Sequence, residues 1–446
     1  MSIFRGKIVT VIIMKSVWQD NATLPSFKPL KKDVTTDVLI IGGGMAGILC
    51  AYSLKNAGIS AVLVESGKIC SSVTAHTTAK ITSQHGFIYS KLLKEFGANA
   101  ARLYYNANQT AISRYRQLCR KIDCDFNEAT SVVYSNNPKK IEAELSALST
   151  IGIKADYKKD LPLPMPTSGG ISFSRQAQFN PLKFVSAICP DLTIHENTRV
   201  RELAPNTALC DNAKIKAKII IVATHFPFDN KHGSYFLKMY QDRSYVIALE
   251  NASPVDGMYV DENEKGLSFR NYGDLLLLGG GSHRTGKNGG NWTELEKFAL
   301  KYYPSAKIKY RWATQDCMTL DGVPYIGKYS KNTPDMYVAT GFNKWGMTSS
   351  MVAAMLLTDA VCGKKNAYAE VFSPSRSILR PKLACNAVSA VCNLLTPTAP
   401  RCPHLGCALK WNSAEHSWDC PCHGSRFDKN GKLLDNPATG DIKIRP

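Results

Sequence analysis

Four cysteines and three histidines gather within residues 401–427 of the chain. They form two short motifs, C-P-H at 402–404 and C-P-C-H at 420–423, separated by fifteen residues. Two Cys and two His can close a tetrahedral zinc site, or hold a [2Fe–2S] cluster with the Cys on one iron and the His on the other. Zinc fingers usually pair Cys with Cys and His with His along the chain, whereas each motif here contributes one of each. The pattern therefore favours the iron–sulfur cluster, with zinc as the alternative.

A second stretch with interpretable chemistry is the glycine-rich turn GGGMAG at 42–47. It follows an apolar run at 38–41, precedes a helical pattern that ends at Gly58, and is followed by another apolar run at 61–64. In this strand–turn–helix–strand setting such glycines bind the pyrophosphate of a dinucleotide at the helix N-terminus. Glu65, which ends the second run, is placed to accept hydrogen bonds from a ribose. The expected contacts are Gly42, Gly44, Met45, Ala46, Gly47 and Glu65.

Later segments favour FAD as the dinucleotide. Residues 70–86 are rich in Ser and Thr, among them Thr78, which suits hydrogen bonding to a ribityl chain and phosphates. A strand at 336–340 runs into a glycine turn and then a helix over 348–361, whose N-terminus would point at the bound group. Residues 42–65 and 338–348 resemble the FAD-binding halves of the D-amino-acid oxidase/glycine oxidase superfamily, over about residues 36–365. The resemblance implies that the late helix faces the flavin through Gly341, Gly346, Met347 and Thr348.

One position departs from that superfamily. Its amino-acid oxidases usually carry an Arg that clamps the substrate carboxylate, and the matching place here reads Gln315-Asp316. The departure argues against a plain amino-acid oxidase. Beside it, Cys317 is either a buried thiol, the preferred interpretation, or a covalent attachment site for the flavin.

Three side chains are candidates for catalysis. His283 and Arg284 follow three glycines at 279–281, in a loop that approaches the flavin ring from the substrate side in similar flavoproteins. Lys344 lies in the turn before the late helix, where a positive charge would favour the anionic reduced flavin. His283 and Arg284 are thus candidates for contact with the substrate, and Lys344 is a candidate for contact with the flavin.

The stretches CPHLGC at 402–407 and CPCHGSRF at 420–427 closely resemble the two cluster-binding loops of Rieske proteins. Only residues 401–446 remain for this module, so its base sheet is shorter than in a full Rieske domain, and the flavin domain is expected to cover one side of it. The whole chain resembles bacterial FAD-dependent oxidoreductases with a C-terminal Rieske domain, through stretches such as TTAKITSQHG at 77–86. The resemblance implies the cluster ligands Cys402, His404, Cys420 and His423, and a disulfide between Cys407 and Cys422.

These motifs predict the fold and its boundaries. We expect an α/β (α+β) FAD-binding Rossmann-like domain with an interleaved substrate domain of mixed sheet and helices, plus a small all-β Rieske module. The expected segments are an N-terminal leader at 1–33, the discontinuous FAD-dependent oxidoreductase at 34–370, a linker at 371–400 and the Rieske module at 401–446. Within the leader, residues 1–13 are interpreted as a disposable extension upstream of Met14.

Composition narrows the choice of partners. The chain has 446 residues, of which 44% are hydrophobic and 20% charged, as in ordinary globular proteins. No apolar run approaches the roughly 20 residues that span a bilayer, so a cytoplasmic protein is expected. The net charge of +19 comes from Lys and Arg spread along the chain without a basic run. Nucleic acid is therefore not expected, and an acidic electron-transfer protein of the ferredoxin or flavodoxin type is the favoured partner.

Together the two ends of the chain predict a flavin- and iron–sulfur-dependent oxidoreductase. FAD would exchange electrons with a small-molecule substrate, and the Rieske cluster would relay single electrons to or from a partner protein. The alternative is a self-contained flavin oxidase or dehydrogenase whose tail is structural and holds zinc or a non-transferring cluster.

Overall fold

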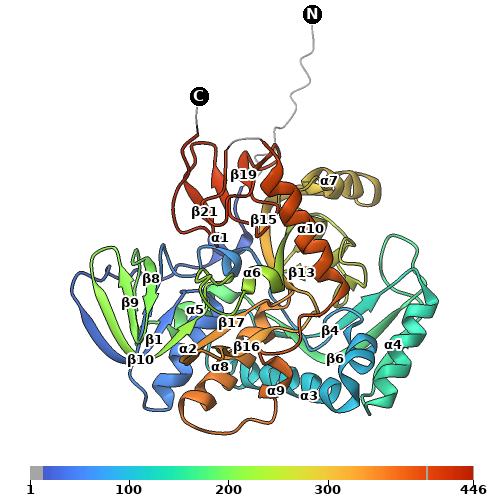
Figure 1. Ribbon diagram of the computed structural model, residues 1–446. Coiled ribbons are helices and arrows are strands. Elements are labelled where there is room, and N and C mark those ends of the chain that lie inside the picture. The colour runs from blue at the N-terminus through green and yellow to red at the C-terminus, as the bar shows by residue number, and fades with distance from the viewer. Residues whose placement is uncertain (1–13, 398–399, 445–446) are drawn as a thin grey trace, which may run out of the picture.

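The computed structural model describes residues 14–397 and 400–444, which form three sheets with helices between and around them (Figure 1). The eight-stranded first sheet has a parallel centre, in which β1 pairs with both β10 and β2. Its strands run in the order β16 (Tyr325–Ser330), β17 (Thr333–Thr340), β10 (Lys214–Val222), β1 (Val34–Ile41), β2 (Ala61–Val64) and β7 (Thr193–His195), and the hairpin of β8 (Val200–Ala204) and β9 (Thr207–Cys210) attaches to β10.

The strands at the centre of this sheet are continuous runs of Val, Ile and Leu because both faces of a parallel sheet are covered. Two helices, α2 (Met45–Asn56) and α8 (Gly346–Val361), pack on each other beside the sheet. Residues 347–357 of α8 are buried on every side of the helix, as expected of a helix inside a core. The long α3 (Ile88–Cys119) packs on α8, and α4 (Pro138–Thr150) packs on α3.

The nine-stranded second sheet is formed by residues that fall between the segments of the first. Its strands run in the order β15 (Lys307–Thr319), β11 (Met239–Glu250), β14 (Leu275–Arg284), β13 (Ser268–Tyr272), β12 (Met258–Asp261), β4 (Asn127–Tyr134), β6 (Gly170–Gln178) and β3 (Lys80–Ile81), with β5 (Asp156–Lys158) paired to β6. Helix α7 (Asn291–Tyr302) packs on β14 and β11. Helix α5 (Pro181–Ile188) and the 3₁₀ turn η1 (Val73–His76) contact each other. The interleaved substrate domain of mixed sheet and helices is thus confirmed.

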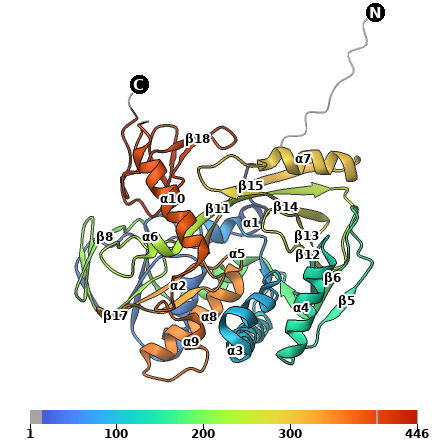
Figure 2. The same cartoon turned by 45° about the vertical axis from the view of Figure 1, so that its right-hand side comes forward.

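The C-terminal module is small and all β after its leading helices. Helix α9 (Ala369–Phe372) still packs on β16 and α3, and α10 (Pro381–Leu395) leads into the module, whose antiparallel sheet is formed by β18 (Lys410–Asn412), β19 (Ser417–Asp419), β20 (Arg426–Asp428) and β21 (Leu433–Asp435). Every strand of this sheet follows the first cysteine motif, so the abbreviated base sheet is a feature of the fold. Figure 2 shows the module and α10 beside β11, and α10 also contacts α6 (Tyr235–Lys238).

The described part of the predicted leader belongs to the folded body. Helix α1 (Val17–Asn21) buries Trp18 completely, and its indole Nε1 donates a hydrogen bond to the carbonyl of Thr77 at 2.7 Å. The Trp18 ring also packs edge-on against Tyr272, with ring centroids 4.7 Å apart. A leader over 1–33 is therefore too long, because residues 17–30 contribute to the core. Residues 1–13 lie outside the described residues.

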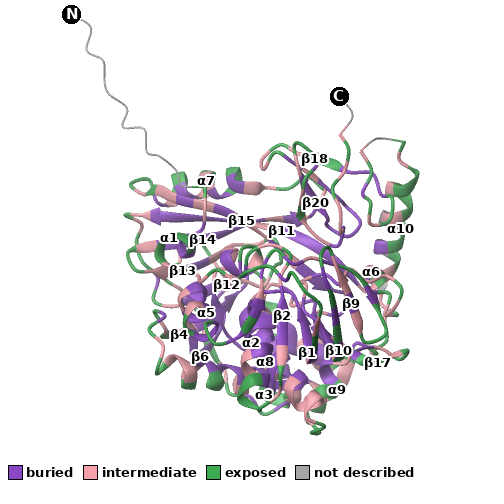
Figure 3. Cartoon of the chain, turned by 90° about the vertical axis from the view of Figure 1, so that its left-hand side faces the viewer, coloured by how far each residue is buried: buried purple, intermediate pink, exposed green. Residues whose placement is uncertain are grey.

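Buried side chains concentrate along the two large sheets and the helices between them (Figure 3). Among the helices of the described ranges, none combines the length and apolar character that a bilayer crossing requires.

Candidate functional site

A cavity of about 810 Å³ lies between the first and second sheets. It is lined by the glycine turn after β1, the end of β10, the start of α8, and the faces of β11, β14 and β15. Residues 432–436 and Thr439 of the C-terminal module line the same cavity. The fold therefore brings residues from three distant parts of the chain to one cavity.

The glycine turn has the geometry of a dinucleotide site. Gly42 has a φ of +112°, and a Cβ there would lie 2.4 Å from the carbonyl oxygen of Ala223. A Cβ at Gly47 would lie 1.9 Å from the carbonyl oxygen of Gly42, so the first helical turn can pack on the strand only without a side chain. A Cβ at Gly44, the N-cap of α2, would lie 3.6 Å from Thr74 Oγ1, and Gly44 lines the cavity beside the helix N-terminus, where a pyrophosphate would bind. The turn therefore fits FAD.

Glu65 and Thr78 line the same cavity, as do Met45 and Ala46. The Glu65 carboxylate accepts hydrogen bonds from the backbone N–H groups of Gly43 at 2.7 Å and Gly67 at 2.8 Å. The Thr78 hydroxyl accepts one from Lys80 Nζ at 3.1 Å. Burial, together with the charge of Arg270, lowers the pKa of Lys80 to about 7, a feature that no sequence motif marked.

The late helix also faces the cavity through Gly341, Gly346 and Met347. Thr348 is buried behind this surface, where its hydroxyl donates to the carbonyl of Thr82 at 3.1 Å. His85 lies 3.1 Å from the same hydroxyl and stacks on Trp345. Burial lowers the pKa of His85 to about 3, so the imidazole beside the helix is neutral.

Of the three catalytic candidates, the structure brings only Lys344 to the cavity. Its ammonium donates to Ser282 Oγ at 3.3 Å and to the carbonyl of Glu264 at 3.2 Å. His283 faces the opposite side of β14 from Ser282, because side chains alternate along a strand. There its ring contacts the hydroxyl of Tyr245 at 3.1 Å.

Arg284 lies beyond the end of the cavity lining, against the second cysteine motif. Its guanidinium donates to the carbonyls of Pro421 at 3.2 Å and Cys422 at 3.3 Å, and to Asn386 Oδ1 at 2.8 Å. The expectation that His283 and Arg284 face the substrate is therefore not met. Both side chains lie where the C-terminal module meets the second sheet.

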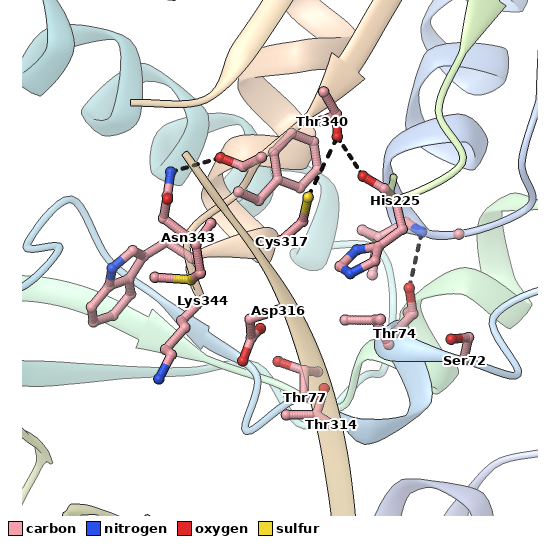
Figure 4. Close-up of a pocket in the computed structure, with 18 of the residues that line it drawn as sticks. Ser72, Thr74, Thr77, His225, Thr314, Asp316, Cys317, Thr340, Asn343 and Lys344 are labelled. Carbon is pink, nitrogen blue, oxygen red and sulfur yellow. Dashed lines mark hydrogen bonds between the residues drawn. The ribbon is translucent and has the colours of Figure 1, made fainter. Parts of the chain in front are cut away.

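Asp316 lines the cavity. The sequence identified this residue as a departure from the superfamily but indicated no role for it. Figure 4 shows the carboxylate between Lys344 and Thr314, and Ser244 Oγ donates to it at 3.4 Å. Burial and the neighbouring Asp242, its partner across β11 and β15, raise the pKa of Asp316 to about 6 against the opposing charge of Lys344. A carboxyl group that titrates near neutral pH inside a cavity is suited to proton transfer.

Cys317 also lines the cavity, next to Met239 Sδ at 3.6 Å. Burial raises the pKa of its thiol to about 12, which keeps the sulfur protonated.

The two cysteine motifs lie on adjacent loops of the C-terminal module. Each loop is closed by the same backbone bond, from Gly406 N to the Cys402 carbonyl and from Gly424 N to the Cys420 carbonyl, both at 2.9 Å. The His404 and His423 rings lie 4.9 Å apart in an edge-to-face arrangement. Cys407 and Cys422 are the disulfide pair that the Rieske resemblance implies. Their sulfur atoms lie next to each other between the two loops.

The donor atoms fit a cluster with two histidine ligands. The Nδ1 atoms of His404 and His423 are buried and have no hydrogen-bond partner in the structure. A buried ring nitrogen without a partner is costly, and coordination to a metal would satisfy it. Burial lowers the pKa of His404 to about 4 and of His423 to about 3, so both rings are neutral as ligation requires.

Two family models match the chain in succession. The model described as "FAD dependent oxidoreductase" (DAO) matches residues 37–360, and the model described as "Rieske [2Fe-2S] domain" matches residues 393–446. The chain belongs to the DAO family of FAD-dependent oxidoreductases. It carries a C-terminal Rieske domain, and its cofactors are FAD and a [2Fe–2S] cluster.

Three known proteins are similar to this chain over most of its length. The Bacillus subtilis (strain 168) protein YhfW, whose name describes it as a Rieske 2Fe-2S iron-sulfur protein, is 36% identical over 96% of this chain and 97% of its own. Gamma-glutamylputrescine oxidoreductase of Escherichia coli (strain K12) is 22% identical over 76% of this chain and 86% of its own. The crystal structure of glycine oxidase from Geobacillus kaustophilus has a TM-score of 0.64 at 18% identity, and covers 77% of this chain and 99% of that one. The last of these shows the fold alone.

A buried charge network joins the Rieske domain of this DAO-family protein to the second sheet. The Glu415 carboxylate accepts hydrogen bonds from Arg243 Nε at 3.0 Å, from Arg426 Nη2 at 2.9 Å and from the Tyr245 hydroxyl at 3.1 Å. Arg243 and Arg426 are 5% and 6% exposed, so these charges are paired away from solvent. His283 supports the network through its contact with Tyr245.

We predict that acid weakens this junction. Burial opposes ionisation of Glu415, but the charges of Arg243 and Arg426 outweigh it and hold its pKa at about 2, below the usual 4.5. The stabilisation is therefore fully present above about pH 4.5 and is lost as the pH falls toward 2.

The measurement is thermal unfolding of the wild type and Glu415→Gln from about pH 7 to about pH 3. The variant should unfold at a lower temperature at neutral pH, and the difference should shrink as the solution becomes acidic. A difference that is constant across this range would contradict the assignment. Glu296→Gln, at an exposed ion pair with Arg311, serves as the matched control.

Proposed function

We propose that the two cofactors act in series. In this proposal FAD exchanges electrons with a small-molecule substrate and the Rieske cluster relays single electrons to or from a partner protein. FAD supplies two-electron chemistry and the cluster one-electron chemistry when they are bound. The chain supplies the cavity, the ligands and the contact between the two sites.

The observation that carries this proposal is the shared wall of the cavity. Residues of the Rieske domain, among them Asp435 and Asn436, line the same space as Gly42 and Glu65 of the FAD-binding domain. A tail with a purely structural cluster would need no such contact with the flavin site. The arrangement favours transfer within one chain over the alternative of a self-contained oxidase.

Two glutamines clamp the domains together at this point. Gln241 Nε2 donates to the carbonyl of His423 at 2.6 Å, and Gln315 Nε2 donates to the carbonyl of Gly424 at 2.8 Å and to Gln241 Oε1 at 2.8 Å. A Cβ at Gly424, whose φ is +81°, would lie 2.7 Å from the Gln241 side chain. The close approach requires glycine at this position of the second cluster loop. It supports a Rieske domain that is held in a fixed position on the FAD-dependent part of the chain, rather than one attached only by a flexible linker.

The first test is EPR on anaerobically purified protein before and after dithionite, with iron, zinc and flavin quantified on the same sample. A rhombic signal of low average g value, with two irons and one FAD per chain, would agree with the relay. Zinc in place of iron would contradict it and favour the structural tail. The same proposal includes the Cys407–Cys422 disulfide, which mass spectrometry of unreduced peptides tests.

We propose an amine as the substrate class. The name of gamma-glutamylputrescine oxidoreductase contains a compound with an amino group. In place of the Arg that clamps a carboxylate, this chain presents Asp316, with Ser244 and Thr314 beside it. A carboxylate at this position favours a substrate amino group and disfavours a substrate carboxylate. The partner in this proposal is an acidic electron-transfer protein, supported by the net charge of +19, and the location is the cytoplasm.

Replacement of Lys344 by Met is expected to lower the reduction potential of the bound flavin. The Lys344 ammonium lines the cavity and is held by Ser282, so its charge would stabilise an anionic reduced ring. We expect a decrease on the order of 30 mV, which corresponds to about 1.4 kcal/mol for a two-electron couple. The measurement is anaerobic redox titration of the flavin absorption, and an unchanged potential would exclude the role. Lys297→Met, on an exposed turn of α7, is the control.

A further inference from the structure

His225 and Phe226, which follow β10, lie between the flavin cavity and the cluster loops. His225 lines the cavity, where Figure 4 shows its imidazole near Thr74. Phe226 is fully buried, and its ring centroid lies 6.5 Å from that of His404 and 6.1 Å from that of His423. One dipeptide therefore contacts the cavity with its first side chain and both histidine ligands of the cluster with its second.

The dipeptide is held in place from both domains. His225 has a φ of +65°, a strained conformation for a residue with a side chain. The Thr340 hydroxyl donates to the His225 carbonyl from the first sheet. From the Rieske domain, Asn436 Nδ2 donates to the carbonyls of Thr224 at 2.6 Å and Phe226 at 2.7 Å. These bonds hold the backbone of the dipeptide from both domains.

The His225 ring, which lines the cavity, carries a buried polar atom without a partner among the described residues. Its Nε2 is buried and has no hydrogen-bond partner in the structure. An unpaired buried nitrogen is costly, and a group bound in the cavity would satisfy it. The His225 ring is thus placed to contact FAD directly.

We propose that His225 and Phe226 form the electron path between the flavin site and the cluster, an inference that rests on the proposed relay. With both cofactors bound, each electron that crossed would oxidise one cofactor and reduce the other by one equivalent. Two crossings would match the two electrons taken from a substrate, and the partner protein would remove them one at a time. In the reverse direction the partner would donate them and the substrate would be reduced.

The glutamine clamp is the competing route, because Gln241 also contacts the second cluster loop. Gln241 and Gln315, however, do not belong to the cavity lining, and they reach the loop at the backbone carbonyls of His423 and Gly424. Phe226 instead packs on the rings whose Nδ1 atoms are set to bind the cluster. The dipeptide is the more direct connection between the two sites.

The test uses the full chain loaded with both cofactors under anaerobic conditions and without substrate. A laser flash on a deazaflavin photoreductant reduces the flavin, and absorption and freeze-quench EPR follow the arrival of electrons at the cluster. We expect Phe226→Leu to slow this transfer by about tenfold or more. The iron content and the g values of the cluster should stay at wild-type values, which a general loss of structure would not allow.

Phe236→Leu is the matched control. Phe236 packs on His423 with ring centroids 6.1 Å apart, but it does not line the cavity. Its replacement should leave the transfer rate within about threefold of wild type. Phe226→Tyr keeps the ring and should restore the rate, so the inference stays testable if Phe226→Leu loads its cluster poorly.

The outcomes separate the inference from the function on which it rests. If the wild-type cluster is never reduced after the flash, the relay itself is wrong and the path with it. If wild-type transfer is fast and both Phe226→Leu and Phe226→Tyr match it, the relay stands and the dipeptide path is overturned. Slowing in Gln315→Leu together with normal transfer in Phe226→Leu would assign the path to the glutamine clamp instead.

Discussion

Replacement of Cys420 by Ser is expected to abolish the iron–sulfur cluster while FAD remains bound. Cys420 is 1% exposed, and its backbone N–H is bonded to the Ser425 carbonyl at 2.8 Å, so the sulfur has a fixed place in the loop. A hydroxyl is a poor substitute for a thiolate as a ligand to iron. We expect the iron content to fall below about a tenth of the wild-type value, since loss of one ligand from a closed site removes most of the binding free energy.

FAD is expected to remain bound because the residues that would hold FAD are separate from those that would hold the cluster. The glycine turn and Glu65 directly follow strands of the first sheet, and within the part of the chain that the structure describes none of their hydrogen bonds involves the cysteine loops. Inductively coupled plasma analysis for iron and absorption spectroscopy for flavin on the same sample provide the measurement. Cys392→Ser, an exposed thiol of α10, is the control and should keep both cofactors. Full iron content in Cys420→Ser would remove this residue from the ligand set.

Loss of the cluster should also lower thermal stability, because metal binding is coupled to folding of its loops. His404 and His423 would then keep buried nitrogens without partners. Their rings pack on Phe226 and Phe236, which belong to the FAD-binding part of the chain. Destabilisation is therefore expected at the contact between domains and not only within the Rieske loops.

The sequence predicted the parts of this site that depend on local geometry. The turn at Gly42 and Gly47 requires glycine because of contacts with residues adjacent in the fold, and the spacing to Glu65 follows from one strand, one turn and one helix. The cluster motifs are likewise short loops, and their Cys and His residues indicate iron–sulfur ligation. Such features can be recognised without knowledge of the rest of the chain.

The sequence could not predict which side of a strand faces the cavity at the domain boundary. Their position after three glycines predicts that His283 and Arg284 lie close to the substrate. In the structure, the alternation along β14 directs Ser282 into the cavity, and Arg284 reaches the second cluster loop. Their position depends on the register between β11 and β14, which is a contact between segments about forty residues apart in the chain.

The Arg243–Glu415–Arg426 network was missed for the same reason. Its members are ordinary charged residues in the sequence, and their pairing spans the two domains. A buried ion pair of this kind is better evidence of a fixed geometry than of high stability. Together with the glutamine clamp, it accounts for the position of a Rieske domain whose own sheet is small.

Asp316→Asn is expected to lower the rate of flavin reduction by an amine by about 10²-fold, within the range for removal of a general base. The carboxylate faces the cavity beside Lys344, and its burial, with the charge of Asp242, raises its pKa to about 6. In the wild type the rate should therefore rise with pH through about 6 as Asp316 ionises. The variant, which cannot ionise at this position, should lose that rise.

The measurement is anaerobic bleaching of the flavin absorption in a stopped-flow instrument, with gamma-glutamylputrescine as the amine probe. Thr314→Val, which changes a neighbouring cavity residue without removing a charge, is the control. A pH profile that is the same in Asp316→Asn and in the wild type would exclude proton transfer by this carboxylate.

Thermal stability separates a catalytic from a structural role for Asp316. Its pKa in the folded protein is raised above the ordinary value of 3.8, so its ionisation costs stability as the pH rises from about 4 to about 6. The neutral amide of Asp316→Asn avoids that cost, and the variant is expected to unfold at a higher temperature than the wild type near neutral pH. A slower but more stable variant would mean that the chain retains an unfavourable buried charge because the reaction uses it. A slower and less stable variant would instead show that Asp316 serves the fold.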